Sequence, residues 1–117
     1  MSKYADIPWE ECPAAYINVL VAKEMKKPMS TMCRIFSEGS ETYLEGEIAY
    51  DPVNTWMDAW DIFDQLLVIT GAVTLKQDGS ATAEINGKQE TATGGHCRAI
   101  CILYLMAKDS ENQLQKA

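Results

Sequence analysis

Histidine is almost absent from this chain, and that absence excludes many kinds of active site. His96 is the one histidine among 117 residues, so any catalytic or metal site that needs two imidazoles is ruled out. The sequence also contains no P-loop lysine motif and no dinucleotide-binding glycine fingerprint, two common means of holding nucleotide phosphates. Without a histidine pair, or a nucleophile placed beside a base, we expect a protein that is not an enzyme, with no catalytic residues and no cofactor.

Basic residues are scarce as well. Lysine and arginine total 10 against 17 aspartates and glutamates, which gives a formal net charge of −7. Lys23, Lys26 and Lys27 form the one basic cluster, and Glu24 interrupts it. Because duplex binding needs cations that displace phosphate counterions, we expect no direct contact with nucleic acid. The acidic excess either keeps the surface solvated or forms a face for a basic partner.

Long apolar runs and an N-terminal signal core are missing too. The longest uncharged apolar run, residues 99–107, is too short to span a bilayer, and residues 1–6 contain no apolar core. The four cysteines have no spacing typical of a disulfide framework: Cys12, Cys33, Cys97 and Cys101. These features predict reduced thiols, no membrane association and a location in the cytoplasm.

The first part of the chain predicts one helix followed by extended segments. Pro13 suits the first position of a helix, and apolar residues keep helical spacing until Pro28 ends the pattern. These apolar residues are Tyr16, Ile17, Leu20, Val21 and Met25. Residues 31–36 then predict a strand, and residues 42–50 predict a second extended segment that breaks near Gly46.

The clearest amphipathic pattern follows residue 53 and predicts a helix that ends near residue 67 or 68. Asn54 or Thr55 can cap its start. Apolar residues fall on one face at steps of three and four: Trp56, Ala59, Trp60, Phe63, Leu66 and Leu67. Polar residues fall on the other face: Asp58, Asp61, Asp64 and Gln65. We therefore expect Trp56 and Trp60 to anchor the core.

Turn signals divide the next stretch. Residues 73–75 and 81–85 are rich in β-branched and small residues and flank Asp78-Gly79, so they predict a hairpin. Asn86-Gly87 predicts a second turn, which leads into the polar stretch 88–93.

The last part of the chain contains a segment that is apolar on every side. A turn of two glycines leads into a helix predicted from about residue 95 to residue 108, and residues 109–117 are expected to fray as a polar tail. A helix without a polar face must be enclosed by the rest of the protein. Residues 1–117 are thus predicted to form a single α+β domain with three helices packed on a small antiparallel sheet, in the order α-β-(β)-α-β-β-α.

An acidic face is the first candidate site. Asp58, Asp61 and Asp64 form a row on the polar side of the second helix, where solvated carboxylates are poorly suited to acid–base catalysis. We expect them instead to meet lysines and arginines of a protein partner. Four glutamates are expected to join them: Glu38, Glu41, Glu45 and Glu47.

The start of the last helix is the second candidate. Gly94 and Gly95 leave backbone N–H groups free to bind an anion or small ligand, and Arg98 would reinforce such a site. The alternative is a simple turn with a structural arginine, paired with an aspartate of residues 51–64.

The cysteines offer a weaker possibility. Cys97 and Cys101 are four residues apart and share a helical face, so with His96 or Cys33 they could hold zinc. Buried structural cysteines in an apolar helix are the commoner arrangement, and adjacent residues such as His96 and Cys97 point apart. We therefore expect neither a metal site nor a Cys–His catalytic pair.

Three blocks of the sequence resemble the NinX-type proteins, which are small accessory proteins of tailed phages and prophages. Residues 16–23 are similar to the family's first helix, residues 50–62 to its central Trp-containing segment, and residues 98–106 to its closing helix. The blocks occur in the family's order. The resemblance brings no enzymatic activity with it, and it implies a phage-encoded protein that acts in the cytoplasm of a bacterial host.

Two functions follow as hypotheses. In the first, the acidic face binds and inhibits a host protein complex with a basic surface, either as an anti-defence protein that mimics nucleic acid, for example against a CRISPR effector, or on transcription or replication machinery. In the second, the helix start at Gly94, Gly95 and Arg98 binds a small molecule or sequesters a nucleotide.

Overall fold

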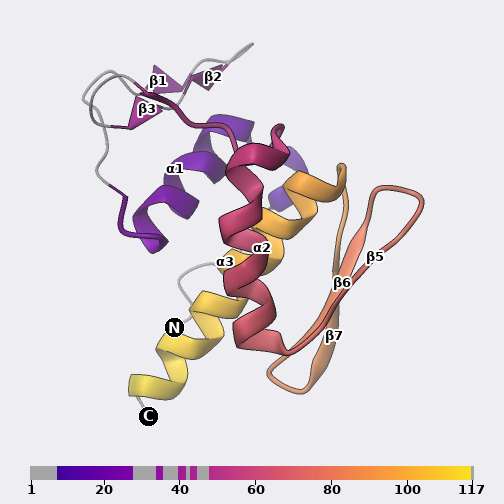
Figure 1. Ribbon diagram of the computed structural model, residues 1–117. Helices are drawn as coiled ribbons and strands as arrows, with labels where there is room; N and C mark the ends of the chain where they lie inside the picture. Colours follow the sequence, from indigo (N-terminus) through magenta and orange to yellow (C-terminus); the bar gives the residue numbers. More distant parts are fainter. Residues whose placement is uncertain (1–7, 28–33, 36–39, 42, 45–47, 117) are drawn as a thin grey trace.

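The computed structural model describes residues 8–27, 34–35, 40–41, 43–44 and 48–116. Figure 1 shows the arrangement of its helices and short strands. The helical segments are η1 (Trp9–Glu11, a 3-10 turn), α1 (Ala14–Glu24), α2 (Trp56–Thr70) and α3 (His96–Lys116). The strands are β1 (Arg34–Ile35), β2 (Ser40–Glu41), β3 (Tyr43–Leu44), β4 (Ile48–Ala49), β5 (Val73–Leu75), β6 (Ala81–Ile85) and β7 (Lys88–Ala92). The α-helices and the antiparallel β5–β7 sheet confirm the predicted α+β class.

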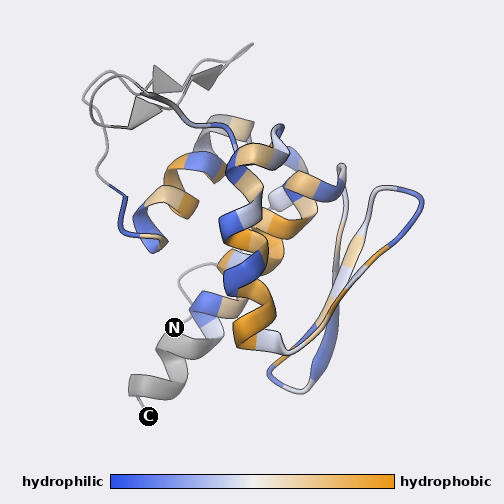
Figure 2. Ribbon diagram, viewed as in Figure 1, coloured by the Kyte–Doolittle hydropathy of each residue, from blue (hydrophilic) through white to orange (hydrophobic). Residues whose placement is uncertain are grey.

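Helix α3 is the centre of the fold. Helices α1 and α2 pack on it, and strands β6 and β7 contact it as well (Figure 1). Every side chain from Ala99 to Leu105 is at most 4 % exposed, so the segment that is apolar on every side is enclosed as predicted. Figure 2 shows the strongly hydrophobic stretches of α2 and α3 at the middle of the molecule.

The end of α3 differs from the prediction. The backbone of residues 109–117 was expected to fray, but the helix continues to Lys116. Residues 109–116 contain no glycine or proline, and their Glu, Gln, Leu and Lys are good helix formers. Asp109 is only 7 % exposed, so the helix leaves the packed body later than its polar composition suggests.

Both of the other helices lie close to their predicted positions. Helix α1 ends at Glu24, and Lys26 takes a left-handed φ of 59°, so the chain leaves the helix just before Pro28. Helix α2 runs past the predicted end to Thr70, because the β-branched residues at its end do not stop it. Gly71, with φ of 85°, closes it by donating its N–H to the Leu67 carbonyl at 2.7 Å.

The sheet has one strand more than the sequence pattern predicts. Strands β5, β6 and β7 are consecutive and antiparallel, with Ala83 opposite Val73 on one side and Glu90 on the other. Asn86 and Gly87 both have positive φ, 54° and 79°, as a tight two-residue hairpin requires. No strand was predicted for the polar stretch after this turn. It forms the edge strand β7. Most of its side chains face solvent, so its sequence lacks the alternation of apolar and polar residues that would predict a strand.

Strands β1, β3 and β4 lie within the predicted extended segments, and β2 lies between these segments. Strand β1 pairs with β2, and β3 pairs with β4, both antiparallel. The second predicted segment thus contains two strands that pair with each other. The rest of residues 28–47 lies outside the described part of the chain.

The two glycines before α3 allow the sheet to approach the helix start. Gly94 and Gly95 have φ of 101° and 103°, a region that L-residues rarely occupy. A Cβ on Gly79, in the β5–β6 turn, would lie 3.3 Å from the Gly95 Cα. The His96 Nε2–H donates to the Lys76 carbonyl at 2.6 Å, so the hairpin and the helix start are held together.

Arg98 connects α3 to the N-terminal segment. Its Nη2 donates to the carbonyl oxygens of Trp9 at 2.7 Å and Cys12 at 2.6 Å, at the C-terminal end of η1. Arg98 is thus a structural residue, as the alternative to a ligand site predicted, but its partners are these carbonyls and the predicted pairing with an aspartate of residues 51–64 is wrong. The stem of Arg98 runs over Gly94, since a Cβ added there would lie 2.7 Å from the arginine Cδ.

Replacing Gly94 with alanine should destabilise the protein more than replacing Gly95. Both changes place an L-residue in a strained backbone region, at a cost of about 1–3 kcal/mol. Only the Gly94 change also displaces the Arg98 stem from the η1 carbonyls, whose charged hydrogen bonds are worth about 1.5–3 kcal/mol. Urea unfolding of G94A and G95A measures the difference. Equal free energies of unfolding would show that the Arg98 anchor contributes nothing.

Candidate functional site

The outer face of α2 is the most unusual surface of the described residues. Trp60 is 53 % exposed and Trp56 37 %, while Met57 and Val68 are exposed to 87 % and 79 %. The side chains that α2 buries are Ala59, Ile62 and Leu66. The prediction that Trp56 and Trp60 anchor the core is thus wrong.

The shift of the buried face has a packing cause. Helix α2 makes its most extensive helix–helix contact with α3, and Ala59, a small residue that is fully buried, lies in its buried face. Ile62 and the partly buried Ile69 widen the apolar arc on the side away from the indoles. The larger indoles are left at the edge of this arc, where they remain half exposed.

Four aromatic rings form a continuous aromatic row on this surface: His96, Trp56, Trp60 and Phe63. The ring centroids of His96 and Trp56 are 6.4 Å apart, those of Trp56 and Trp60 5.1 Å, and those of Trp60 and Phe63 6.0 Å. Such tilted and edge-on pairs attract one another by about 0.5–1.5 kcal/mol beyond the burial of their area. The exposed indoles are therefore held in place before any ligand arrives.

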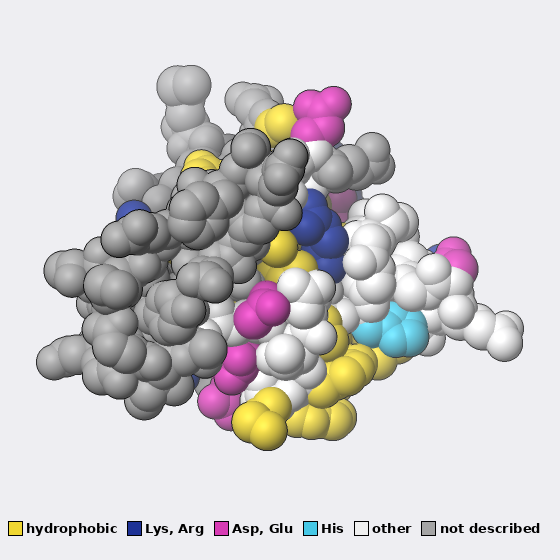
Figure 3. All heavy atoms as spheres, turned by 90° about the horizontal axis from the view of Figure 1, so that it is seen from above, with side chains coloured by type: hydrophobic (Ala, Val, Ile, Leu, Met, Phe, Trp, Pro, Cys, Tyr) yellow, Lys and Arg dark blue, Asp and Glu magenta, His cyan; other side chains and the backbone are white. Residues whose placement is uncertain are grey.

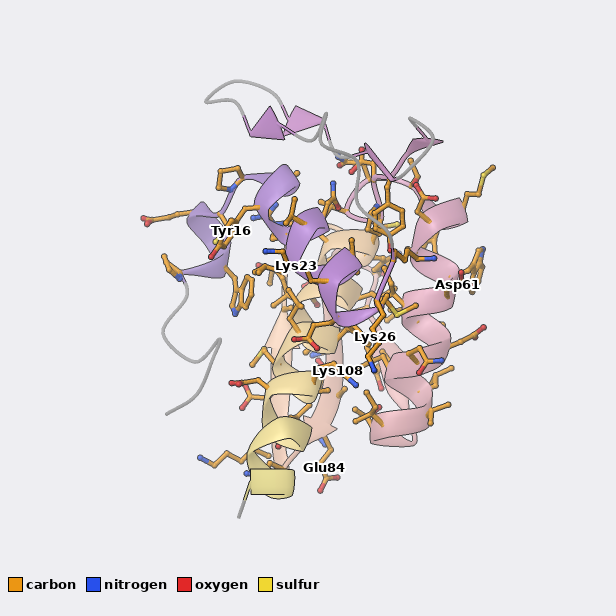
Figure 4. All side chains as sticks on the ribbon, turned by 90° about the vertical axis from the view of Figure 1, so that its left-hand side faces the viewer. Tyr16, Lys23, Lys26, Asp61, Glu84 and Lys108 are labelled. Atoms are coloured by element: carbon orange, nitrogen blue, oxygen red, sulfur yellow. The ribbon has the colours of Figure 1, made fainter. Side chains whose placement is uncertain are left out.

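Carboxylates lie beside the aromatic row. Asp61 and Asp64 are exposed, and Asp61 projects from α2 away from the body of the protein in Figure 4. Figure 3 shows hydrophobic side chains gathered along one edge of the surface, with acidic side chains and the histidine beside them. The surface combines flat apolar rings with negative charge.

Asp58 has a different role from its two neighbours. Its Oδ2 accepts the Asp51 N–H at 2.9 Å and lies 3.0 Å from the Thr55 hydroxyl oxygen, so it closes the first turn of α2. The expected row of three solvated aspartates is therefore reduced to Asp61 and Asp64. The predicted glutamates Glu38, Glu45 and Glu47 lie outside the described residues, and only the backbone of Glu41 is described, in β2.

The start of α2 is positioned by a polar residue that sequence reasoning missed. Asn18, on α1, is 1 % exposed. Its Nδ2 donates to Asp51 Oδ1 at 2.9 Å, and its Oδ1 accepts the Val53 N–H at 3.1 Å. The signal was present in the sequence, because an asparagine between Ile17 and Val19 is unusual on an apolar helix.

The predicted ligand site at the start of α3 is built differently from the prediction. The Arg98 Nη2 donates to the carbonyl oxygens of Trp9 and Cys12, Gly94 lies against the stem of Arg98, and Gly95 lies against Gly79 of the β5–β6 turn. The structure therefore does not bring the arginine and the free backbone N–H groups together around one anion.

The thiols of α3 are buried. Burial raises the pKa of the Cys97 thiol, and it raises the pKa of the Cys101 thiol strongly. No group of three His, Cys, Asp or Glu side chains that could hold a metal ion is found within the described ranges.

An open pocket of about 390 Å³ lies between η1, β7 and α3. Its walls mix apolar and polar groups: Pro8, Trp9, Glu11, Thr91, Ala92, Thr93, Ile102 and Met106.

None of the described helices combines the length and apolar character that crossing a membrane requires.

Replacing Trp60 with alanine should cost little stability, while Ile62→Ala should cost much more. The half-exposed indole contributes mainly its stacking, so we expect a loss of less than about 1.5 kcal/mol. Ile62 is fully buried, and its truncation should cost about 2–5 kcal/mol. Urea unfolding of W60A and I62A provides the test. Equal losses in the free energy of unfolding would mean that the Trp60 side chain belongs to the core.

Tyr50 allows a second stability test. Its side chain is 3 % exposed, and its hydroxyl has no hydrogen-bond partner among the described residues. The pKa of this hydroxyl is raised far above its usual value. Burial is the largest cause, and the nearby Cys101 and Asp58 add to it. An unfolded tyrosine ionises near pH 10, so the folded protein should lose stability as the pH rises through that value.

Tyr50→Phe should therefore leave the free energy of unfolding near pH 7 unchanged or raise it, by up to about 1–3 kcal/mol, because it removes a buried unpaired hydroxyl. It should also weaken the loss of stability above about pH 10. Tyr16→Phe, at a position 38 % exposed, is the control in the same urea series. A clear destabilisation of Y50F at pH 7 would mean that the hydroxyl is hydrogen-bonded.

Known proteins provide no further guide to this surface. No protein-family model, no curated protein and no solved structure matches the chain. The resemblance to the NinX-type family therefore stays a prediction, and the functional argument depends on the residues themselves.

Proposed function

We propose that the protein is a non-enzymatic, protein-binding protein that uses the outer face of α2 to bind a basic surface of its partner. The observation that carries this proposal is the exposure of two stacked tryptophans on a well-packed helix. Trp56 and Trp60 are 37 % and 53 % exposed. By contrast, Ala59, Ile62 and Leu66 of the same helix are fully buried.

Exposed tryptophans support binding for an energetic reason. Tryptophan is among the residues that contribute most to protein–protein interfaces, since a large, rigid ring loses little conformational freedom on binding. Here the two indoles already contact each other, His96 lies beside Trp56, and Phe63 meets Trp60 edge-on. Met57, exposed to 87 %, adds adaptable apolar surface beside them.

The charge of the surface supports a basic partner. Asp61 and Asp64 lie among the exposed apolar residues of α2, and the whole chain carries a net charge of −7. Such a field accelerates encounter with a positive surface and discourages acidic partners. The same field disfavours nucleic acid as the ligand.

The proposal extends to the biological setting through the resemblance of three sequence blocks to NinX-type phage proteins. On that basis the partner is a host protein complex in the bacterial cytoplasm, and binding inhibits it, with a nucleic-acid-binding defence complex as the leading candidate. The small-ligand alternative has weaker support, because Arg98 is engaged by the carbonyls of Trp9 and Cys12.

Reversing the two exposed charges should abolish partner binding. The variant D61K/D64K leaves Asp58 unchanged, because Asp58 closes the start of α2. The wild-type protein and the variant are immobilised, exposed to lysate of a bacterial host, and compared by quantitative mass spectrometry. A partner retained by the wild type should be depleted about tenfold or more on the variant, and also on W60A.

Glu11→Lys/Glu84→Lys is the matched control, since it changes the net charge equally at exposed positions on η1 and β6. Figure 4 shows Glu84 well away from Asp61. The control should retain the partner within about twofold. Retention by D61K/D64K and W60A at the wild-type level would contradict the proposal.

A further inference from the structure

Four exposed side chains on the outer face of α2 have the spacing that accepts one side chain of a facing helix. We propose that the space between Met57, Trp60, Asp61 and Asp64, which we term the α2 hole, receives an arginine of an α-helix in the partner. This inference rests on the proposed function and narrows it, because it names the residue type and the structural element that the face recognises.

The spacing of the four residues defines the hole. Positions i, i+3, i+4 and i+7 surround a single gap on a helix surface, and in helix pairs such a gap accepts one side chain of the facing helix. All four side chains are exposed, Met57 to 87 % and Trp60 to 53 %. The hole is therefore open to a ligand.

The chemistry of the hole favours a guanidinium group. One wall is the Trp60 indole, on which a planar cation stacks, and two walls are the carboxylates of Asp61 and Asp64, which accept its N–H groups. Met57 offers a soft apolar contact for the arginine stem. Lysine fits less well, because its compact ammonium is more strongly hydrated and cannot both stack and donate along two directions.

The aromatic row fixes the wall on which the arginine would stack. Trp56 lies 5.1 Å from Trp60 between ring centroids, with the planes tilted by 39°, and Phe63 meets Trp60 edge-on at 6.0 Å. Neighbouring rings therefore restrain the indole on two sides. A ligand does not need to order this ring, which reduces the entropic cost of binding.

A helix is the partner element that matches the shape of this surface. The exposed side chains of α2 run from Met57 to Val68 along about three helical turns, or roughly 16 Å, on a convex ridge. A facing helix meets such a ridge by inserting its side chains between those of α2.

A second copy of this chain is a poor candidate for the occupant. Two α2 faces placed together would bring Asp61 and Asp64 of both copies close to one another, and each copy carries a net charge of −7. Like charges across an interface oppose association. A single-stranded nucleic acid could stack bases on Trp60, but its phosphates would meet the same carboxylates.

A displayed library of helical peptides tests the inference directly. Peptides with an alanine-rich helical frame and randomised positions on one face are selected on the wild-type protein and counter-selected on W60A. The expected result is enrichment of arginine over lysine at one central position. The selected peptide should then lose about tenfold in affinity when that arginine is replaced by lysine, and bind D61N/D64N about tenfold or more weakly, while E11Q/E84Q binds normally.

The outcomes separate this inference from the proposed function. Face-dependent peptides without an arginine preference, or equal affinity for the lysine peptide, would overturn the arginine hole and leave the binding face intact. An absence of any peptide that distinguishes wild type from W60A would overturn the arginine hole, and the lysate experiment then decides separately on the face. Dimerisation in sedimentation experiments that W60A abolishes would assign the face to a second copy instead.

Discussion

The burial of α3 on all sides is the constraint on which the rest of the structure depends. A helix whose side chains from Ala99 to Leu105 are all enclosed needs covering surface around its whole circumference. Helices α1 and α2 supply part of it, and strands β6 and β7 supply another part. Elements from both the first and the later part of the chain therefore share α3 as their common packing surface.

This requirement explains why functional surface is left on α2. Helix α2 covers α3 with Ala59, Ile62 and Leu66, a stripe that fills only one side of a strongly apolar helix. Phe63 and Ile69 are partly buried at the margins of this stripe, while Trp56, Met57, Trp60 and Val68 lie on the exposed side of the helix. The exposed indoles are thus a consequence of how the centre is covered, and the neighbouring carboxylates give that surface a preference for cations.

The sequence predicts the positions of the elements well and their orientation less well. Turn residues mark some boundaries well, so the pair Asn86-Gly87 turns the chain where it was expected to, whereas α2 continues past its predicted end until Gly71 closes it. The sequence could not show which face of α2 is buried. Apolar residues such as Trp56, Ile62 and Ile69 cover so wide an arc of the helix that the middle of the buried face cannot be identified. The partner of Arg98 was also unpredictable, since backbone carbonyls leave no trace in a sequence.

Asn18 has a consequence for how uniquely the helices are arranged. An interface made only of aliphatic side chains tolerates small sliding movements at little cost, because dispersion contacts lack direction. The hydrogen bonds that join Asn18 to Asp51 and Val53 are directional, and a shift of α1 by one turn would leave the Asn18 amide and the Val53 N–H without these partners. Asn18 thus fixes the position of α1 along the segment that leads into α2. It contributes more to a single defined arrangement of the helices than to stability.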